Sequence, residues 1–122
     1  MPLSFKSAGV YTTGGAPEAS PNAATPAAAR IFEIPDKNEQ GDRSNGVRFY
    51  IQFTTPVATP NLNIVPWVFD EANGNWAQGV AITGIEDFDA LQIPNLAPGR
   101  VFFQVTGEAG TFASAEFFAA PL

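Results

Sequence analysis

The residues of this chain that could do chemistry are carboxylates, because it contains neither histidine nor cysteine. Two acidic clusters stand out: Asp70 with Glu71, and Glu86 with Asp87 and Asp89. A pair of carboxylates can act as acid and base in glycoside hydrolysis. Both clusters fall in predicted turns, however, where aspartate is favoured because it hydrogen-bonds the local backbone. We therefore expect no catalytic residues and no enzymatic activity.

A calcium-type loop is suggested by Asp36, Asn38 and Gln40, which alternate ahead of Gly41. The twelfth position of such a loop needs a bidentate glutamate, but Val47 occupies it here. The lack of cysteine and histidine also removes the usual ligands of zinc. We therefore expect a structural loop, no metal and no cofactor, although weak calcium binding at a turn stays open.

The charge pattern bears on the class of partner. The net charge is −6 with only six lysines and arginines, so the chain lacks the basic stripe that neutralises phosphates in nucleic-acid binding. It has no basic cluster for anionic lipid and no apolar run as long as a membrane span. The first residues lack the apolar core of a signal peptide. We expect no nucleic acid and no membrane as partners, and synthesis in the cytoplasm.

The elements that must position any site are short strands. Eleven glycines and eleven prolines punctuate the 122 residues, which favours many strands joined by turns over long helices. Residues 47–53 alternate with the period of a half-buried strand, and residues 100–105 repeat this alternation. We predict an all-β chain of about seven strands, folded as an antiparallel β-sandwich of immunoglobulin-like or jelly-roll type. The predicted strands are 30–34, 47–53, 62–69, 76–85, a short one within 90–99, 100–105 and 111–118.

Two local signals refine this prediction. Pro66 lies inside the third strand, and because proline cannot donate a ladder hydrogen bond, it predicts an edge position or a bulge. Asn73-Gly74 predicts a hairpin, because both residues tolerate a positive φ. The segment around Leu96, Pro98 and Gly99 resembles the corner between strands E and F of immunoglobulin-like and fibronectin type III domains.

The first 28 residues differ in texture from the rest. They are rich in alanine, proline and glycine, and Lys6 and Glu18 are their only charges. Such a stretch buries too little apolar surface to offset its ordering entropy. We predict an extended N-terminal arm over residues 1–28, ordered by a partner, and a β-sandwich domain over residues 29–122. The apolar side chains of the arm that we expect to fill pockets of the partner are Leu3, Phe5, Val10 and Tyr11.

Two predicted strands carry one pattern on the face opposite the core, namely arginine, an aromatic residue and glutamine at alternate positions. Aromatic residues and arginine are enriched in protein interfaces. We therefore expect this sheet face to bind a partner through Arg48, Tyr50, Gln52, Arg100, Phe102 and Gln104. The tryptophans Trp67 and Trp76 lie on neighbouring predicted strands, and with Tyr50 they could form an aromatic platform for sugars.

An arm, a compact acidic sandwich and no catalytic set together resemble the decoration (cement) proteins of tailed-bacteriophage capsids. The resemblance implies a structural virion protein that is made in the host cytoplasm and stabilises the capsid lattice at the virion surface. It implies the major capsid protein and neighbouring copies as partners, with a trimer favoured. Two alternatives stay open: a filament subunit that assembles by strand addition, and a carbohydrate-binding β-sandwich module.

Overall fold

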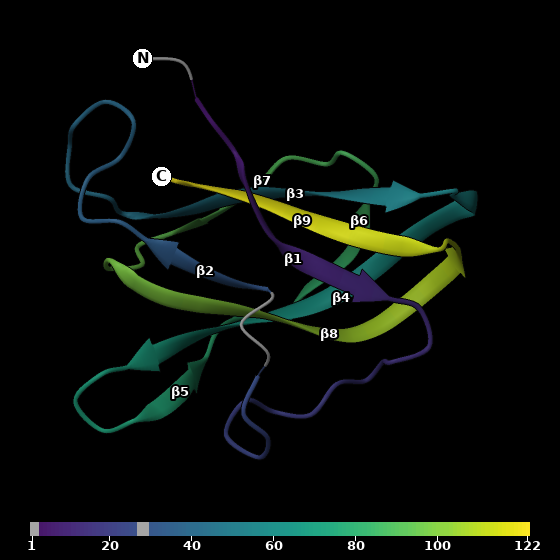
Figure 1. Ribbon diagram of the computed structural model, residues 1–122, viewed down its shortest axis with the longest axis horizontal. Helices are drawn as coiled ribbons and strands as arrows, with labels where there is room; N and C mark the ends of the chain where they lie inside the picture. Colours follow the sequence, from purple (N-terminus) through teal and green to yellow (C-terminus); the bar gives the residue numbers. More distant parts are fainter. Residues whose placement is uncertain (1–2, 27–29) are drawn as a thin grey trace.

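The computed structural model describes residues 3–26 and 30–122, and in these the chain is all-β, with two antiparallel sheets packed face to face. Sheet A has the strand order β1-β9-β3-β7, and sheet B has the order β2-β8-β4-β5, with β6 also paired to β4. Figure 1 shows sheet A above sheet B. The strands are β1 (Lys6–Thr12), β2 (Ile31–Ile34), β3 (Gly46–Thr54), β4 (Val57–Asp70), β5 (Asn75–Gln78), β6 (Ile82–Glu86), β7 (Leu91–Pro94), β8 (Gly99–Thr111) and β9 (Ser114–Pro121).

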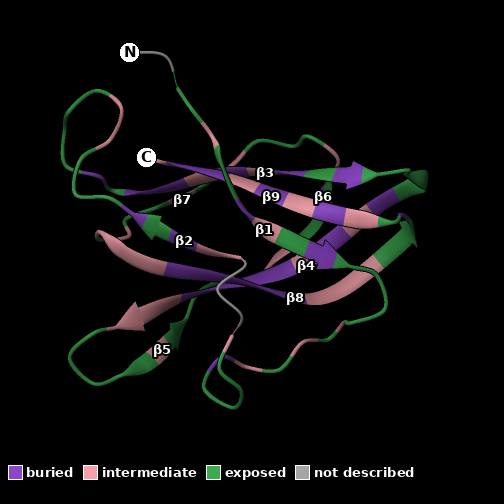
Figure 2. Cartoon of the chain, in the orientation of Figure 1, coloured by how far each residue is buried: buried purple, intermediate pink, exposed green. Residues whose placement is uncertain are grey.

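The core lies between the two sheets, as the buried segments in Figure 2 show. The alternation read from the sequence is confirmed in β3, where Val47, Phe49, Ile51 and Phe53 are buried, but in β8 all of residues 101–105 are buried. At the centre Phe103 packs against Phe49 and Phe117, with ring centroids 5.1 and 5.5 Å apart. The predicted antiparallel β-sandwich is therefore correct at the level of its two packed sheets.

The edge position predicted for Pro66 is wrong, because β4 lies inside sheet B between β8 and the pair β5 and β6. The predicted alternative was a bulge, and both ladders of β4 do shift register nearby, within residues 62–64. Proline has no N–H that could donate a hydrogen bond to a neighbouring strand. On the side of β4 away from β8, the neighbouring strand is interrupted beside Pro66, between β5 and β6. Strand β6 pairs with β4 up to Ile64 and β5 pairs with it from Trp67 on, so no ladder partner is needed between them. The Gly79 N–H still donates to the Pro66 carbonyl at 2.7 Å.

The same interruption corrects the predicted strand 76–85, which is two strands, β5 and β6, with residues 79–81 between them. The predicted hairpin is confirmed, since β4 and β5 pair up to Asp70 and Asn75 around a turn that contains Gly74 at φ 73°. Asp70 stabilises this turn, because its carboxylate accepts hydrogen bonds from Asn73 and Ala72 that lower its pKa.

The extended arm is the largest difference from the sequence-based prediction. Residues 6–12 form β1, an edge strand of sheet A that pairs with β9 of the same chain. Tyr11 is 2% exposed and belongs to the core, so it cannot fill a pocket of a partner in this conformation. Residues 13–26, which we call the strap, then cross from sheet A to the outer face of sheet B (Figure 1).

Two further findings concern the chain as a whole. Among residues 3–26 and 30–122, no helix has the length and hydropathy needed to cross a membrane. Residues 27 and 28, which the predicted arm includes, lie outside the described residues, as do Met1 and Pro2.

Candidate functional site: an aromatic face on sheet A

The outer face of sheet A carries a row of paired side chains from β3 and β9. Tyr50 lies opposite Phe118 in the antiparallel register, and the two rings stack with centroids 5.1 Å apart. Gln52 lies opposite Glu116 on one side of this pair. Because successive side chains of a strand point to opposite faces, these residues share the face that is turned away from the core.

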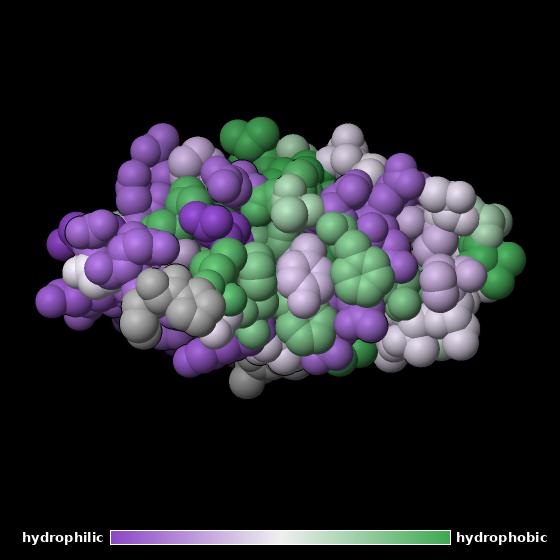
Figure 3. Space-filling model, turned by 90° about the horizontal axis from the view of Figure 1, so that it is seen from above, coloured by the Kyte–Doolittle hydropathy of each residue, from purple (hydrophilic) through white to green (hydrophobic). Residues whose placement is uncertain are grey.

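Two more aromatic rings join this pair from outside the strands. Phe5 precedes β1 and packs edge-on against Tyr50 at 5.0 Å, and Phe88 lies 6.0 Å from Tyr50 on another side. We call the four rings Phe5, Tyr50, Phe88 and Phe118 the aromatic face. Figure 3 looks onto sheet A and shows hydrophobic side chains gathered in its middle, with hydrophilic side chains at one end.

Phe88 is held in solvent by its backbone. Its side chain is 59% exposed, and its φ of 61° is a left-handed conformation that costs free energy for any residue but glycine. Two hydrogen bonds fix this turn: the Phe88 N–H donates to the Ile51 carbonyl at 2.8 Å, and the Phe53 N–H donates to the Asp87 carboxylate at 3.0 Å. A strained turn that presents a large apolar ring to water is typical of a binding surface.

The aromatic face has a charged rim of both signs. Arg48 lies beside it on β3, opposite Ala120, and its Nε atom is buried with no hydrogen-bond partner among the described residues. Glu116 accepts a hydrogen bond from the Ser7 hydroxyl at 2.6 Å on the other side. Within the described chain the ion pairs are Glu18–Arg30 and Glu71–Arg100, so Arg48 and Glu116 are in neither.

The structure brings together some of the residues predicted to bind a partner. Phe5 of the predicted arm contacts Tyr50 of the predicted sheet face, and Leu3 and Val10 are also exposed. Sequence reasoning did not select Phe88 or Phe118. Exposure of Phe88 could have been predicted from its position within the acidic turn of residues 86–89, because a side chain in such a turn rarely reaches the hydrophobic core.

The second half of the predicted partner face lies elsewhere. Arg100, Phe102 and Gln104 are on the outer face of sheet B, so they do not form one surface with the β3 residues. Phe102 and Gln104 are buried. The Gln104 amide donates to the Glu18 carbonyl at 2.9 Å, which places the strap over this face. The sequence analysis treated the outward residues of β3 and β8 as equivalent and did not foresee that the strap covers those of β8. The alternation of a strand shows which residues face outward, but not what covers them.

The predicted sugar platform is not formed by the two tryptophans. Trp67 is 9% exposed and donates its indole N–H to the Gln104 side chain at 2.8 Å. Trp76 is partly buried and packs edge-on against Phe69, 4.9 Å away. Tyr50 is on the opposite sheet, so the three aromatic residues cannot stack on one sugar chain.

The strap is fixed to sheet B by a partly buried ion pair. Both terminal guanidinium nitrogens of Arg30 donate to the Glu18 carboxylate, and Nη1 also donates to the Phe103 carbonyl at 2.8 Å. The same carboxylate accepts the Val105 N–H at 2.7 Å. The Arg30 guanidinium also lies 5.5 Å from the centroid of the Phe102 ring. The ion pair therefore joins Glu18, within the strap, to Arg30, the residue directly before β2.

A second carboxylate fixes the start of the strap. Glu108 of β8 accepts hydrogen bonds from the Tyr11 hydroxyl at 2.8 Å, the Thr13 hydroxyl at 3.1 Å and the Gly14 N–H at 2.9 Å. Burial alone would raise the pKa of Glu108, but these three hydrogen bonds lower it overall. Burial and, next in size, the hydrogen bond to Glu108 together raise the pKa of Tyr11 to about 12.

This pair makes a prediction about pH. Tyr11 and Tyr50 are the only tyrosines, so in Tyr50→Phe the absorbance of tyrosinate should report Tyr11 alone, with a midpoint near pH 12. Because the pKa is raised in the folded protein, its contribution to stability is complete below pH 10 and is lost as the pH rises towards 12. Glu108→Gln in the same background should lower the midpoint, and a midpoint near 10 in the folded Tyr50→Phe protein would contradict the contact.

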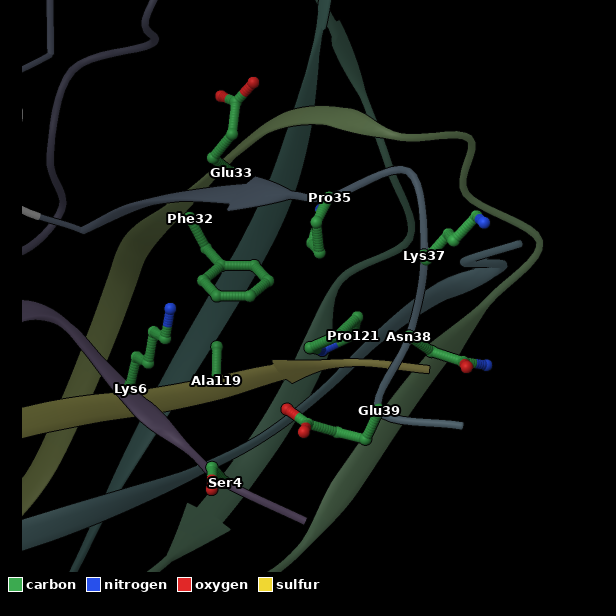
Figure 4. Close-up of a pocket in the computed structure, with 10 residues that line it drawn as sticks. All are labelled: Ser4, Lys6, Phe32, Glu33, Pro35, Lys37, Asn38, Glu39, Ala119 and Pro121. Atoms are coloured by element: carbon green, nitrogen blue, oxygen red, sulfur yellow. The ribbon is translucent and has the colours of Figure 1, made fainter. Parts of the chain in front are cut away.

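A cavity of about 260 Å³ opens between the edges of the two sheets, beside β1 and β2. Figure 4 shows the Phe32 ring over Ala119, with Lys6 and Glu39 on either side, while Glu33 and Lys37 point away. The floor is apolar and small. Lys6 and Glu39 place one positive and one negative charge at the rim of the cavity, but its polar groups do not converge on a point where a small ligand would bind.

No group of three or more carboxylates that could hold a metal ion occurs in the described part of the chain. The carboxylates named in the acidic turns have local roles instead: Asp70 and Asp87 accept backbone hydrogen bonds, and Glu71 pairs with Arg100. Comparison with family models, with curated proteins and with solved structures finds no match to this chain.

Proposed function

We propose that this chain is a structural protein of a virus particle, a capsid decoration protein that acts through protein contacts at the aromatic face. The observation that carries the proposal is Phe88, an exposed ring on a strained turn that lies beside Tyr50, the ring that Phe5 and Phe118 also contact. Aromatic residues within a polar rim are typical of the centre of a protein interface. Binding energy recovered on burial would offset the cost of exposing them.

We further propose that the sandwich is a jelly roll. If β5 and β6 are taken as one interrupted strand, the first, last, third and sixth strands form sheet A, and the second, seventh, fourth and fifth form sheet B. Successive strands then alternate between the sheets until the turn from the fourth to the fifth, as in a pair of interleaved Greek keys. Jelly rolls are common in viral capsid and lectin domains, which supports a virion protein by analogy.

The alternatives have less support. A filament subunit that donates its first strand to a neighbour would have to release β1, which here pairs with β9 of its own chain. A carbohydrate-binding module fits the jelly-roll proposal, but Trp67 is buried beneath the strap. The partners we propose are the major capsid protein and neighbouring copies at the virion surface.

The proposal predicts that the chain is part of particles. An antibody to the purified protein should label the outside of tailed-phage particles whose genome encodes this chain in immunogold electron microscopy, and added protein should pellet with those particles. Phe88→Asp should reduce pelleting at least about tenfold, because a charge replaces an apolar ring at the contact. Particles free of the chain, together with no pelleting of the wild-type protein, would contradict a virion role.

A further inference from the structure

We infer that the partner at the aromatic face is a second copy of this chain, docked face to face about a two-fold axis. This inference rests on the proposed function and names the partner at its surface. It differs from the trimer that the resemblance to decoration proteins implies. The argument starts from the register of β3 and β9, which fixes where the charges of the rim lie.

The charges lie on opposite sides of the central aromatic pair. Tyr50 faces Phe118 in the register, Arg48 faces Ala120 two residues before it, and Gln52 faces Glu116 two residues after it. Each strand residue spans about 3.4 Å, so Arg48 and Glu116 lie about 7 Å from the centre in opposite directions along the strands. The aromatic face therefore has a positive charge at one end and a negative charge at the other, along the direction of the strands.

A two-fold axis between two copies places the positively charged end of one face opposite the negatively charged end of the other. If the axis lies between two facing sheets, runs across the strands and passes over the Tyr50–Phe118 pair, it reverses the order of the rows in the second copy. Arg48 of each copy then comes opposite the Gln52 and Glu116 row of the other. The aromatic rings meet in the middle, as the inner faces of two aligned sheets do in a sandwich.

The unsatisfied groups of the face favour this occupant. Among the described residues neither Arg48 nor Glu116 is in an ion pair, and Glu116 accepts a hydrogen bond from the Ser7 hydroxyl. A second copy supplies the missing carboxylate and the missing guanidinium in one step, twice over by symmetry. The chain has only six basic residues against twelve acidic ones, so a face that brings its own arginine to a carboxylate limits the repulsion between two acidic molecules.

Sedimentation equilibrium of the full-length protein tests the inference. The wild-type protein should show a monomer–dimer equilibrium at concentrations up to about 1 mM, where even weak pairing is populated. Phe88→Asp should shift it to monomer. Val80→Asp is the matched control, because Val80 is 85% exposed and lies outside the aromatic face, so the same change there should leave the equilibrium unaltered.

Charge exchange tests the two-fold geometry itself. Arg48→Glu and Glu116→Arg should each weaken the dimer at least about tenfold, because each places like charges opposite one another. Mixing the two variants, or combining both changes in one chain, should restore it. The fluorescence of Trp67 and Trp76, which lie on the other sheet, checks that each variant is folded.

The outcomes separate this inference from the proposed function. A wild-type protein that stays monomeric throughout, or a mixture of Arg48→Glu and Glu116→Arg that fails to associate, overturns the two-fold docking. If Phe88→Asp still loses binding to particles in that case, the proposed function stands with a different partner at the face. If the dimer forms and exchanges charges as described, but the chain does not associate with particles, the docking holds and the virion role falls.

Discussion

Removal of residues 1–12 is expected to unfold the domain. These residues contain β1, which covers the edge of β9 and places Ala8 and Tyr11 in the core. Tyr11→Ala alone should lower the free energy of unfolding by about 4 kcal/mol, as for other large aromatic residues cut back in a core. A small domain has about 5–15 kcal/mol in total, so loss of the whole strand should leave little folded protein.

Urea denaturation followed by tryptophan fluorescence measures this effect. Val10→Ala is the matched control, because Val10 is the neighbour of Tyr11 on β1 and is exposed. It should cost less than about 1 kcal/mol. A truncated protein that unfolds at the same urea concentration as the full chain would restore the interpretation of this segment as a dispensable arm.

Glu18→Gln is expected to release the strap from sheet B. The change keeps the shape of the side chain but removes the charge that faces Arg30, and the side chains of this pair are only 11% and 20% exposed. Breaking a pair that is largely out of water leaves an uncompensated charge, which should cost about 3 kcal/mol. The same release should make the bond after Arg30 accessible, so trypsin should cleave there faster than in the wild-type protein.

The second ion pair supplies the control for this experiment. Arg100 and Glu71 also form a salt bridge, but their side chains are 40% and 67% exposed. An exposed pair contributes little, so Glu71→Gln should change the free energy of unfolding by less than about 1 kcal/mol and leave cleavage after Arg30 unchanged. Equal effects of the two substitutions would show that the strap is not held by the charge of Glu18.

The strands of the sandwich could be predicted because their alternation reports directly on burial. Val47, Phe49, Ile51 and Phe53 point to the core as their spacing requires. The turn at Asn73-Gly74 was equally readable, because its chemistry is local. The break between β5 and β6 was not predicted, since it depends on a proline in the adjacent strand, Pro66, and alternation within one strand carries no information about its neighbour.

The first strand and the strap could not be predicted for a related reason. β1 is rich in small residues, with only Ala8 and Tyr11 buried, so its composition resembles that of a disordered segment. What orders it comes from distant parts of the chain: β9 supplies the ladder, and Glu108 accepts the Tyr11 hydroxyl. Such contacts join residues about a hundred positions apart, and no local window of sequence contains both partners.

The candidate site was predicted in part. Arg48, Tyr50 and Gln52 do share an outer face of sheet A, but their companions on β8 face the other way. Phe5, chosen as an arm residue, contributes to the same face. Which rows of two sheets form one surface depends on the order of the strands, and that order is a property of the whole fold.

The place of β9 has a consequence for the folding of the chain during its synthesis. This strand lies between β1 and β3, and both pair with it. A nascent chain that has not yet reached residue 114 therefore contains β1 and β3 without the strand that joins them. Sheet A can be completed only after residues 114–121 have been made, and until then β1 and β3 both lack β9, the strand that pairs with each of them. Proteins dominated by such distant pairings fold slowly, and their unpaired edges are prone to aggregate.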